Sequence, residues 1–393
     1  MKAEPFEIAI PQDELDDLRL RLGRTRWADD YGNHDWRYGV ERRWLEEMIA
    51  YWRDGYDWRA TERAINRYPN FKVSIDGIPL HFVHVRGNGR KPMPLLLLHG
   101  WPWTFMDYYP LIGPLTDPAA HGADSEDAFD LIIPSLPGYG FSMPLTTAGL
   151  DIPRQAELFR TLVRDVLGYP RFAVGGGDWG AAITTWMGHA FAQEVIGVLA
   201  SIPYFPGLEL PALAPERYAP EEQWMLARRS ETADSIMSHF VVQSTDPQTL
   251  AYALVDSPVG TAAWLWERRR AWSDCNGDLL AAFDRESLCA LASIYWLTRS
   301  IGTSMRSYWE HARAGGLPLK PVHERTPPVG VPCGFAIFPK EVMLIPRAVA
   351  AEGTNLKRWT LMRRGGHFGF AENAADSAAE FRSFFASLRG GAT

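Results

Sequence analysis

Asp178 lies in the short segment GGDWG (176–180), between a strand-like stretch and a helical one. Small residues on both sides suit a sharp strand-to-helix turn, because such a turn is strained and its neighbours pack closely. A turn of this kind lifts one side chain above a sheet. A carboxylate there is already ionised at neutral pH and can attack a saturated carbon without a base to activate it. The alternative is that Asp178 only caps the following helix.

A late histidine and a preceding acid complete a possible catalytic set. His367 lies in the loop GGHF (365–368), after the last predicted strand, and Glu341 follows the predicted strand 333–338, 26 positions earlier. The order nucleophile, acid, histidine is the one that α/β-hydrolases use, with the acid orienting the imidazole and stabilising its protonated form. Asp130 is a weaker candidate for the acid, and Glu341 is alternatively an exposed residue beside Lys340.

The segment HGWP (99–102) follows the first long apolar strand. In this position an α/β-hydrolase places half of its oxyanion hole. We expect the backbone N–H groups of Trp101 and Trp179 to point at one oxygen, and losing one such donor typically costs about 10²–10³ in rate. A plain strand-to-loop turn is the alternative.

Composition excludes several classes of function. The net charge is -7, and the densest basic run, 268–270, is predicted to be a solvated helix face, so nucleic-acid binding is not expected. The three cysteines, Cys275, Cys289 and Cys333, form no CxxC pair and no zinc-like spacing. We therefore expect a reducing compartment and neither a metal nor a cofactor.

The N-terminal twenty residues lack the long apolar run of a signal peptide. The longest aliphatic stretch, 95–98, is far too short to cross a bilayer. These features predict a soluble, cytoplasmic protein without a membrane anchor.

The elements that must position these residues follow from hydrophobic periodicity. Helices are predicted from about residue 11, with Leu15, Leu18 and Leu22 on one face, and over 44–54, before a hairpin at 72–86. From residue 94, strands alternate with helices, which is typical of a parallel sheet covered by helices. The alternation stops between about 206 and 317, where the chain is helical and rich in Trp and Tyr, and then resumes.

The prediction is therefore an α/β class protein with an α/β-hydrolase fold: a mostly parallel sheet flanked by helices, an inserted helical cap and an N-terminal helical and hairpin extension. The expected divisions are the extension at 1–89, the first part of the core at 90–206, the cap at 207–317 and the second part of the core at 318–393.

The motifs HGWP, PSLPGYGFS, GGDWG, FPKE and RGGHF, in this order, resemble those of epoxide hydrolases of the microsomal type. The stretch from Trp36 to Phe71, followed by IDGIPLHFVHVR, resembles the N-terminal domain of that family. The chain looks like the soluble bacterial and fungal members. The resemblance implies that Asp178 attacks an epoxide and forms an ester, which is hydrolysed by water that His367 and Glu341 activate.

The resemblance also implies two cap tyrosines that protonate the ring oxygen. Tyr308, in SMRSY (304–308), matches the second, whereas His239 stands where the first is expected. A neutral imidazole can donate an N–H, so His239 is predicted to act with Tyr308, and Tyr252 is the alternative. Trp103 replaces an expected small residue and is predicted to narrow the pocket. The residues expected to contact substrate are His99, Pro102, Trp103 and Tyr252.

Two other functions remain possible at this point. A haloalkane dehalogenase would use the same nucleophile, with Trp179 binding halide, and a non-catalytic ligand-binding protein would keep the fold without turnover. A serine-type esterase is disfavoured by Asp178 itself. The expected partner is a small epoxide, apolar or aromatic because of the aromatic cap, and a homodimer is possible.

Overall fold

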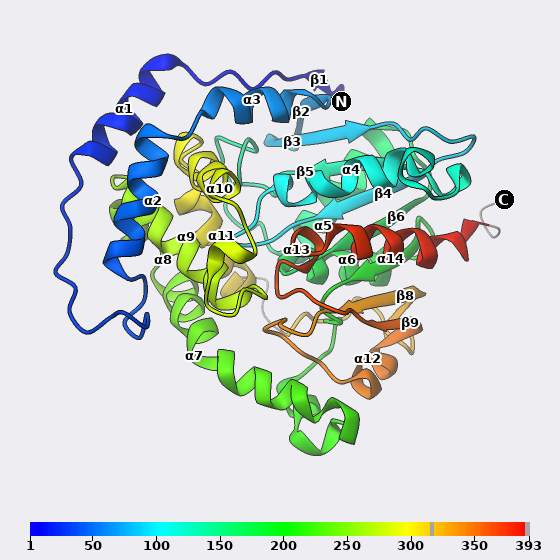
Figure 1. Ribbon diagram of the computed structural model, residues 1–393. Coiled ribbons are helices and arrows are strands. Elements are labelled where there is room, and N and C mark those ends of the chain that lie inside the picture. The colour runs from blue at the N-terminus through cyan, green and yellow to red at the C-terminus, as the bar shows by residue number, and fades with distance from the viewer. Residues whose placement is uncertain (315–317, 390–393) are drawn as a thin grey trace.

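One sheet of nine strands runs through the part of the chain that the computed structural model describes, residues 1–314 and 318–389, in the order β1-β2-β3-β5-β4-β6-β7-β8-β9 (Figure 1). Strands β4 to β9 pair in parallel and β1, β2, β3 and β5 pair antiparallel, so the predicted mostly parallel sheet is confirmed. The strands are β1 (Glu4–Pro5), β2 (Asn70–Ile75), β3 (Ile78–Val85), β4 (Met93–Leu98), β5 (Phe129–Pro134), β6 (Phe172–Gly176), β7 (Val195–Ala200), β8 (Val329–Ile337) and β9 (Thr354–Leu361).

Helices cover both faces of the parallel part of the sheet (Figure 1). The central strand β4 reads MPLLLL and its four leucines are fully buried, as expected where a strand is covered on both sides. The covering helices are α4 (Tyr109–Thr116), α5 (Ile152–Thr161), α6 (Trp179–Ala190), α12 (Arg347–Gly353), α13 (Gly369–Glu372) and α14 (Ala374–Ala386).

The predicted hairpin is present. Ile75 of β2 pairs with Ile78 of β3, and the two residues between them, Asp76 and Gly77, have φ angles of 52° and 79°. Positive φ at both positions is the geometry that a two-residue hairpin turn requires, and Asp-Gly adopts it readily.

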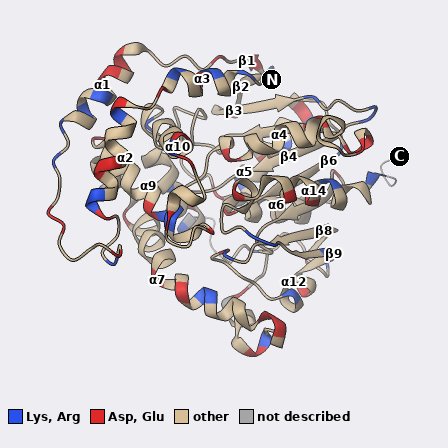
Figure 2. Cartoon of the chain, viewed as in Figure 1, with Lys and Arg blue, Asp and Glu red and all other residues tan. Residues whose placement is uncertain are grey.

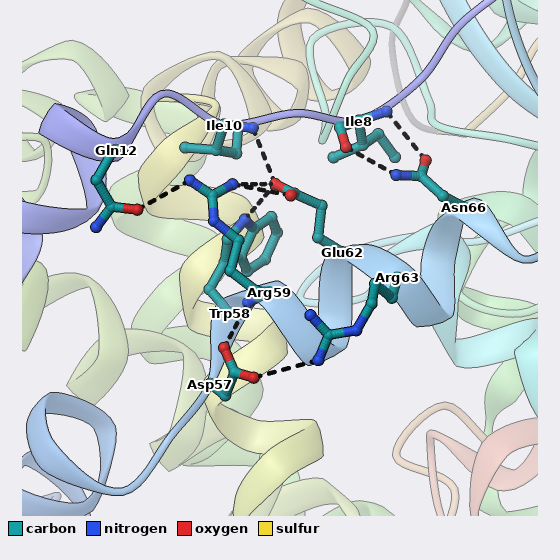
Figure 3. A network of polar contacts seen from close by, with 9 residues as sticks. All are labelled: Ile8, Ile10, Gln12, Asp57, Trp58, Arg59, Glu62, Arg63 and Asn66. Carbon is teal, nitrogen blue, oxygen red and sulfur yellow. Dashed lines mark hydrogen bonds and ion pairs between the residues drawn. The ribbon is translucent and has the colours of Figure 1, made fainter.

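The N-terminal segment is fixed to helix α3 (Trp58–Asn66) by polar contacts (Figure 3). The amide of Asn66 accepts from the backbone N–H of Ile8 at 3.0 Å and donates to its carbonyl at 2.8 Å. Glu62 accepts from the N–H of Ile10 at 2.9 Å and from the indole of Trp58 at 2.8 Å. The N–H and the carbonyl of Ile8 therefore both have hydrogen-bond partners, although this extended residue belongs to no strand.

Helix α1 (Gln12–Gly23) buries Leu15, Leu18 and Leu22, as the periodicity predicted, and α2 (Arg42–Asp54) follows it. These two helices lie beside α9 (Pro258–Trp272) and α10 (Arg285–Leu297) of a helical insertion between β7 and β8 (Figure 1). The helices of the insertion are α7 (Gln223–Thr245), α8 (Pro247–Leu254), α9 (Pro258–Trp272), α10 (Arg285–Leu297) and α11 (Ile301–Trp309). The predicted end of this segment at residue 317 lies outside the described residues.

Both acidic and basic residues lie on α1, α2 and α7 (Figure 2). The prediction for the basic run 268–270 is wrong in part, because Arg268 and Arg269 are buried. The Arg269 guanidinium bonds to Asp107 at 2.8 Å, and Arg268 donates to the carbonyl of Ser235. Both guanidinium groups therefore bind acceptors inside the protein and do not form a solvated basic face. Within 1–314 and 318–389, no helix is both long and apolar enough to span a membrane.

Candidate active site

Asp178 occupies the turn between β6 and α6, with a φ of 53°. A Cβ added to Gly180 would lie 1.9 Å from the carbonyl oxygen of Leu98, and one added to Gly100 would lie 2.0 Å from Oδ1 of Asp178. Only glycine fits at either position, so the predicted need for small residues around the turn is confirmed at Gly180. The Asp178 side chain makes no capping hydrogen bond to α6, which rules out the capping alternative.

A backbone amide holds one oxygen of this carboxylate. The N–H of Trp101 donates to Oδ1 of Asp178 at 2.7 Å, and the N–H of Trp179 also lowers the pKa of the carboxyl group. Burial raises the pKa of Asp178, but the neighbouring His367 and the two amides lower it more, and the net pKa lies below the ordinary value. The carboxylate is therefore an anion at neutral pH.

His367 lies between two carboxylates. Its Nδ1 bonds to Oε1 of Glu341 at 2.7 Å, and its Nε2 lies 3.2 Å from Oδ2 of Asp178 without the alignment of a hydrogen bond. Glu341 is fully buried and also accepts from the N–H of Val342 at 2.7 Å. Asp130, the other candidate acid, instead accepts from Gly87 and Tyr169, so it takes no part in this arrangement.

Tyr308 on α11 and His239 on α7 approach each other above the carboxylate. Nε2 of His239 lies 3.3 Å from the phenol oxygen of Tyr308, and the His239 ring stacks on Trp101 with centroids 5.2 Å apart. Burial, assisted by the positive charge of Arg268, lowers the pKa of His239 to about 3, so its imidazole is neutral. Burial raises the pKa of Tyr308, so the phenol keeps its proton.

These side chains share a cavity of about 380 Å³ between the sheet and the helical insertion. Apolar side chains form most of its wall, which suits an apolar ligand. The lining residues are Asp178, Trp179, Ala182, Ile202, Tyr204, Leu213, Arg229, Ala233, Ile236, Met237, His239, Phe240, Trp272, Tyr308, Val342, Met343, Leu344 and His367.

Four residues predicted to contact substrate lie elsewhere. Tyr252 is 71% exposed, because α8 turns Ala251 and Leu254 inward and leaves Tyr252 on its outer face. His99 is buried beneath the site, where its Nε2 accepts from the N–H of Leu136 at 3.1 Å.

Trp103 also does not line the cavity, and neither does Pro102. The Trp103 ring is fully buried and packs edge to face with the ring of His367, with centroids 5.8 Å apart, so it supports the histidine from within the core. The prediction that Trp103 narrows the pocket is therefore wrong. Its large ring fills space in the core beside His367.

Most of the lining residues were not predicted from the sequence, Trp272 and Arg229 among them. Trp272, at the end of α9, packs against His239 and His367, with ring centroids 4.8 and 5.2 Å away. Arg229 on α7 donates to the carbonyl of Leu213 at 3.2 Å. Neither stands in a recognisable motif, and only the packing of α7 and α9 over the sheet brings them to the cavity.

The fold and the nucleophile–acid–histidine arrangement define an α/β hydrolase with a carboxylate at the position of the nucleophile. Two family models match: "Epoxide hydrolase N terminus" over residues 3–108 and "alpha/beta hydrolase fold" over residues 93–215. Epoxide hydrolase 1 of Sus scrofa is 34% identical, over 98% of this chain and 88% of that protein. The chain belongs to the epoxide hydrolase family.

Solved structures of epoxide hydrolases share the fold of this chain. The juvenile hormone epoxide hydrolase of the silkworm Bombyx mori superposes with a TM-score of 0.88 at 29% identity, covering 100% of this chain and 96% of that one. The Aspergillus niger epoxide hydrolase gives 0.85 at 26% identity, covering 99% and 97%. Both similarities extend over the N-terminal extension, the sheet and the helical insertion.

Proposed function

We propose that this protein hydrolyses an epoxide to a vicinal diol in two chemical steps, with Asp178 as the nucleophile. The observation that carries the proposal is the contact of one carboxylate with both an oxyanion hole and a histidine. Trp101 holds Oδ1 of Asp178 at 2.7 Å, while Oδ2 lies beside His367 at the cavity. Oδ2 is therefore the oxygen placed to attack.

In the first step, Oδ2 of Asp178 forms a bond to an epoxide carbon, and the bond from that carbon to the ring oxygen breaks. The ring oxygen takes the electron pair and receives the phenol proton of Tyr308, which avoids the release of a free alkoxide. The neutral His239 supports this transfer with a hydrogen bond to the phenol oxygen or to the ring oxygen. The product is a hydroxyalkyl ester of Asp178.

In the second step, Nε2 of His367 removes a proton from water, and the hydroxide adds to the ester carbonyl. The amides of Trp101 and Trp179 stabilise the resulting oxyanion. The tetrahedral intermediate collapses, and the diol leaves with the proton that His367 took. The second proton of the water, left on the new carboxyl group of Asp178, returns to the Tyr308 phenolate, so the carboxylate and the phenol are both restored. Glu341 holds the imidazole through Nδ1 and stabilises its protonated form.

The helical insertion is proposed to act as the cap, with the divisions 1–89, 90–206, 207–317 and 318–393. It supplies half of the residues that line the cavity, His239 and Tyr308 among them, and the largely apolar wall favours apolar or aromatic epoxides. A cytoplasmic location is supported by three free, buried cysteines. A homodimer stays a prediction, which light scattering can test.

One experiment tests the covalent mechanism: a single turnover in water enriched in heavy oxygen, with enzyme in excess over an aryl epoxide. The first diol should carry no solvent oxygen, because its new oxygen comes from Asp178. After several turnovers, the peptide containing Asp178 should carry the label. A first diol with solvent oxygen would contradict the mechanism, and halide release from haloalkanes without epoxide turnover would favour the dehalogenase alternative.

A further inference from the structure

The carboxylate of Glu372, at the end of α13, joins two parts of the chain that meet at the active site. Its Oε1 accepts from the backbone N–H groups of Gly366 and Phe368, both at 3.1 Å. These residues stand immediately before and after His367. Its Oε2 accepts from the N–H of Asp274, in the helical insertion, at 2.6 Å. One side chain therefore holds the loop of the histidine and ties it to the insertion.

The two segments are in close contact at this point. The N–H of His367 donates to the carbonyl of Trp272 at 2.8 Å, and the N–H of Gly365 donates to the Asp274 carboxylate at 3.0 Å. A Cβ added to Gly366 would lie 2.3 Å from the Trp272 carbonyl oxygen. The Trp272 side chain lines the cavity. The position of the His367 ring is therefore set jointly by its loop and by the end of α9.

Keeping the Glu372 carboxylate charged in this buried position lowers the stability of the fold. Burial raises the pKa of Glu372 to about 7, against the lowering effect of its three N–H donors, and the negative charge of Asp274 raises it further. A carboxyl group with a folded-state pKa above its unfolded value stabilises the fold at low pH. That contribution is lost as the pH rises toward 7. At neutral and higher pH, the anion is kept at a cost in stability.

We propose that Glu372 is a positioning residue for His367 in the hydrolysis of the ester. It acts through the backbone on both sides of the histidine and through the end of α9, without contacting substrate. This inference rests on the proposed two-step function. It deepens that function because it assigns Glu372 to the second step and not to the first, in which Asp178 and Tyr308 act.

The test separates the two steps in rapid-quench single turnovers with an aryl epoxide. Glu372→Ala should slow hydrolysis of the ester by about 10- to 100-fold, because small displacements of a catalytic group cost rate on this scale. Formation of the ester should stay within about twofold of wild type, so the ester accumulates. Glu372→Gln keeps one acceptor oxygen for the two loop amides and should give an intermediate rate.

Thermal unfolding of Glu372→Gln at pH 5 and pH 8 separates positioning from simple stabilisation. The variant should be at least as stable as wild type at pH 8, although its hydrolysis is slower. Asp274 and His367 are the same in both proteins, so the difference isolates Glu372. Glu380→Gln is the matched control, since Glu380 is a buried carboxylate that bonds to Arg358 on β9, and it should leave the ratio of the two rates unchanged.

Equal slowing of both steps in the Glu372 variants, or unchanged hydrolysis, would overturn the positioning role. If wild type and His367→Gln both show no ester at any time, the two-step function itself is wrong. The two failures are thus distinguishable.

Discussion

Nε2 of His367 lies 3.2 Å from Oδ2 of Asp178, the oxygen that is proposed to attack. Burial lowers the pKa of His367, but Glu341 and Asp178 raise it more, so the free enzyme holds an imidazolium between two carboxylates. Formation of the ester removes the charge of Asp178. The imidazolium then loses one of the two groups that favour it, so its pKa falls. It releases its proton and is neutral when the second step needs a base.

Replacing His367 by Gln should leave attack by Asp178 possible and slow hydrolysis of the ester by about 10²–10⁴-fold, the usual contribution of a general base. Intact-mass measurement after mixing with an aryl epoxide should show a protein heavier by one epoxide. His189→Gln is a control, because His189 is buried but bonds to the carbonyl of Pro328 away from the cavity. Absence of an adduct with several epoxides would count against the histidine's role.

The two steps should respond differently to pH. Because the pKa of Asp178 is lowered, its anion persists below pH 5, and ester formation should change little between pH 8 and pH 5. Hydrolysis of the ester needs a neutral His367 and should fall as the pH drops. Quenched samples at steady state should therefore contain more ester at pH 5 than at pH 8. A constant fraction of ester across this range would contradict the assignment of His367 as the base.

The loops that carry Asp178, Glu341 and His367 could be placed from the sequence because their positions depend on local chemistry. Asp178 stands in a turn that Gly180 makes possible, Glu341 follows the apolar strand β8, and His367 follows β9, the last strand of the alternating pattern. The carboxyl ends of parallel strands meet at one edge of a sheet, so three residues far apart in the sequence were expected together.

The helical insertion was less predictable, because its side chains are oriented by packing and not by a repeating pattern. Tyr252 was a candidate from its position in the sequence, yet burial of Ala251 and Leu254 turns it outward. Trp272 and Glu372 stand in no motif. Their roles arise only where the end of α9 meets the loop of His367, which is a tertiary contact.

The pair of Tyr308 and His239 should contribute to ring opening. Tyr308→Phe should slow formation of the ester by about 10²-fold or more, since it removes the proton donor. His239→Phe should have a smaller effect in the same direction, and His239→Tyr should recover part of the rate by restoring a donor. Single-turnover quench measures this step directly.

Tyr252→Phe serves as the control for these variants, because the exposed hydroxyl of Tyr252 lies outside the cavity. Its rate of ester formation should equal that of wild type. Wild-type rates in both His239 variants would remove His239 from the site and leave Tyr308 as the sole donor of the pair.

The ion pair of Arg269 and Asp107 should matter for stability, because it is buried where α9 meets the loop after HGWP. The two groups are 2.8 Å apart, with side-chain exposures of 3% and 9%, and the guanidinium lies over the ring of Phe368, 4.0 Å from its centroid. Asp107→Asn leaves a buried cation unpaired and should lower the free energy of unfolding by about 3–5 kcal/mol in urea titrations. Glu47→Gln, in the exposed pair with Arg43, should cause no measurable loss. A small loss in Asp107→Asn, similar to that of the control, would show that water or another acceptor replaces the lost charge.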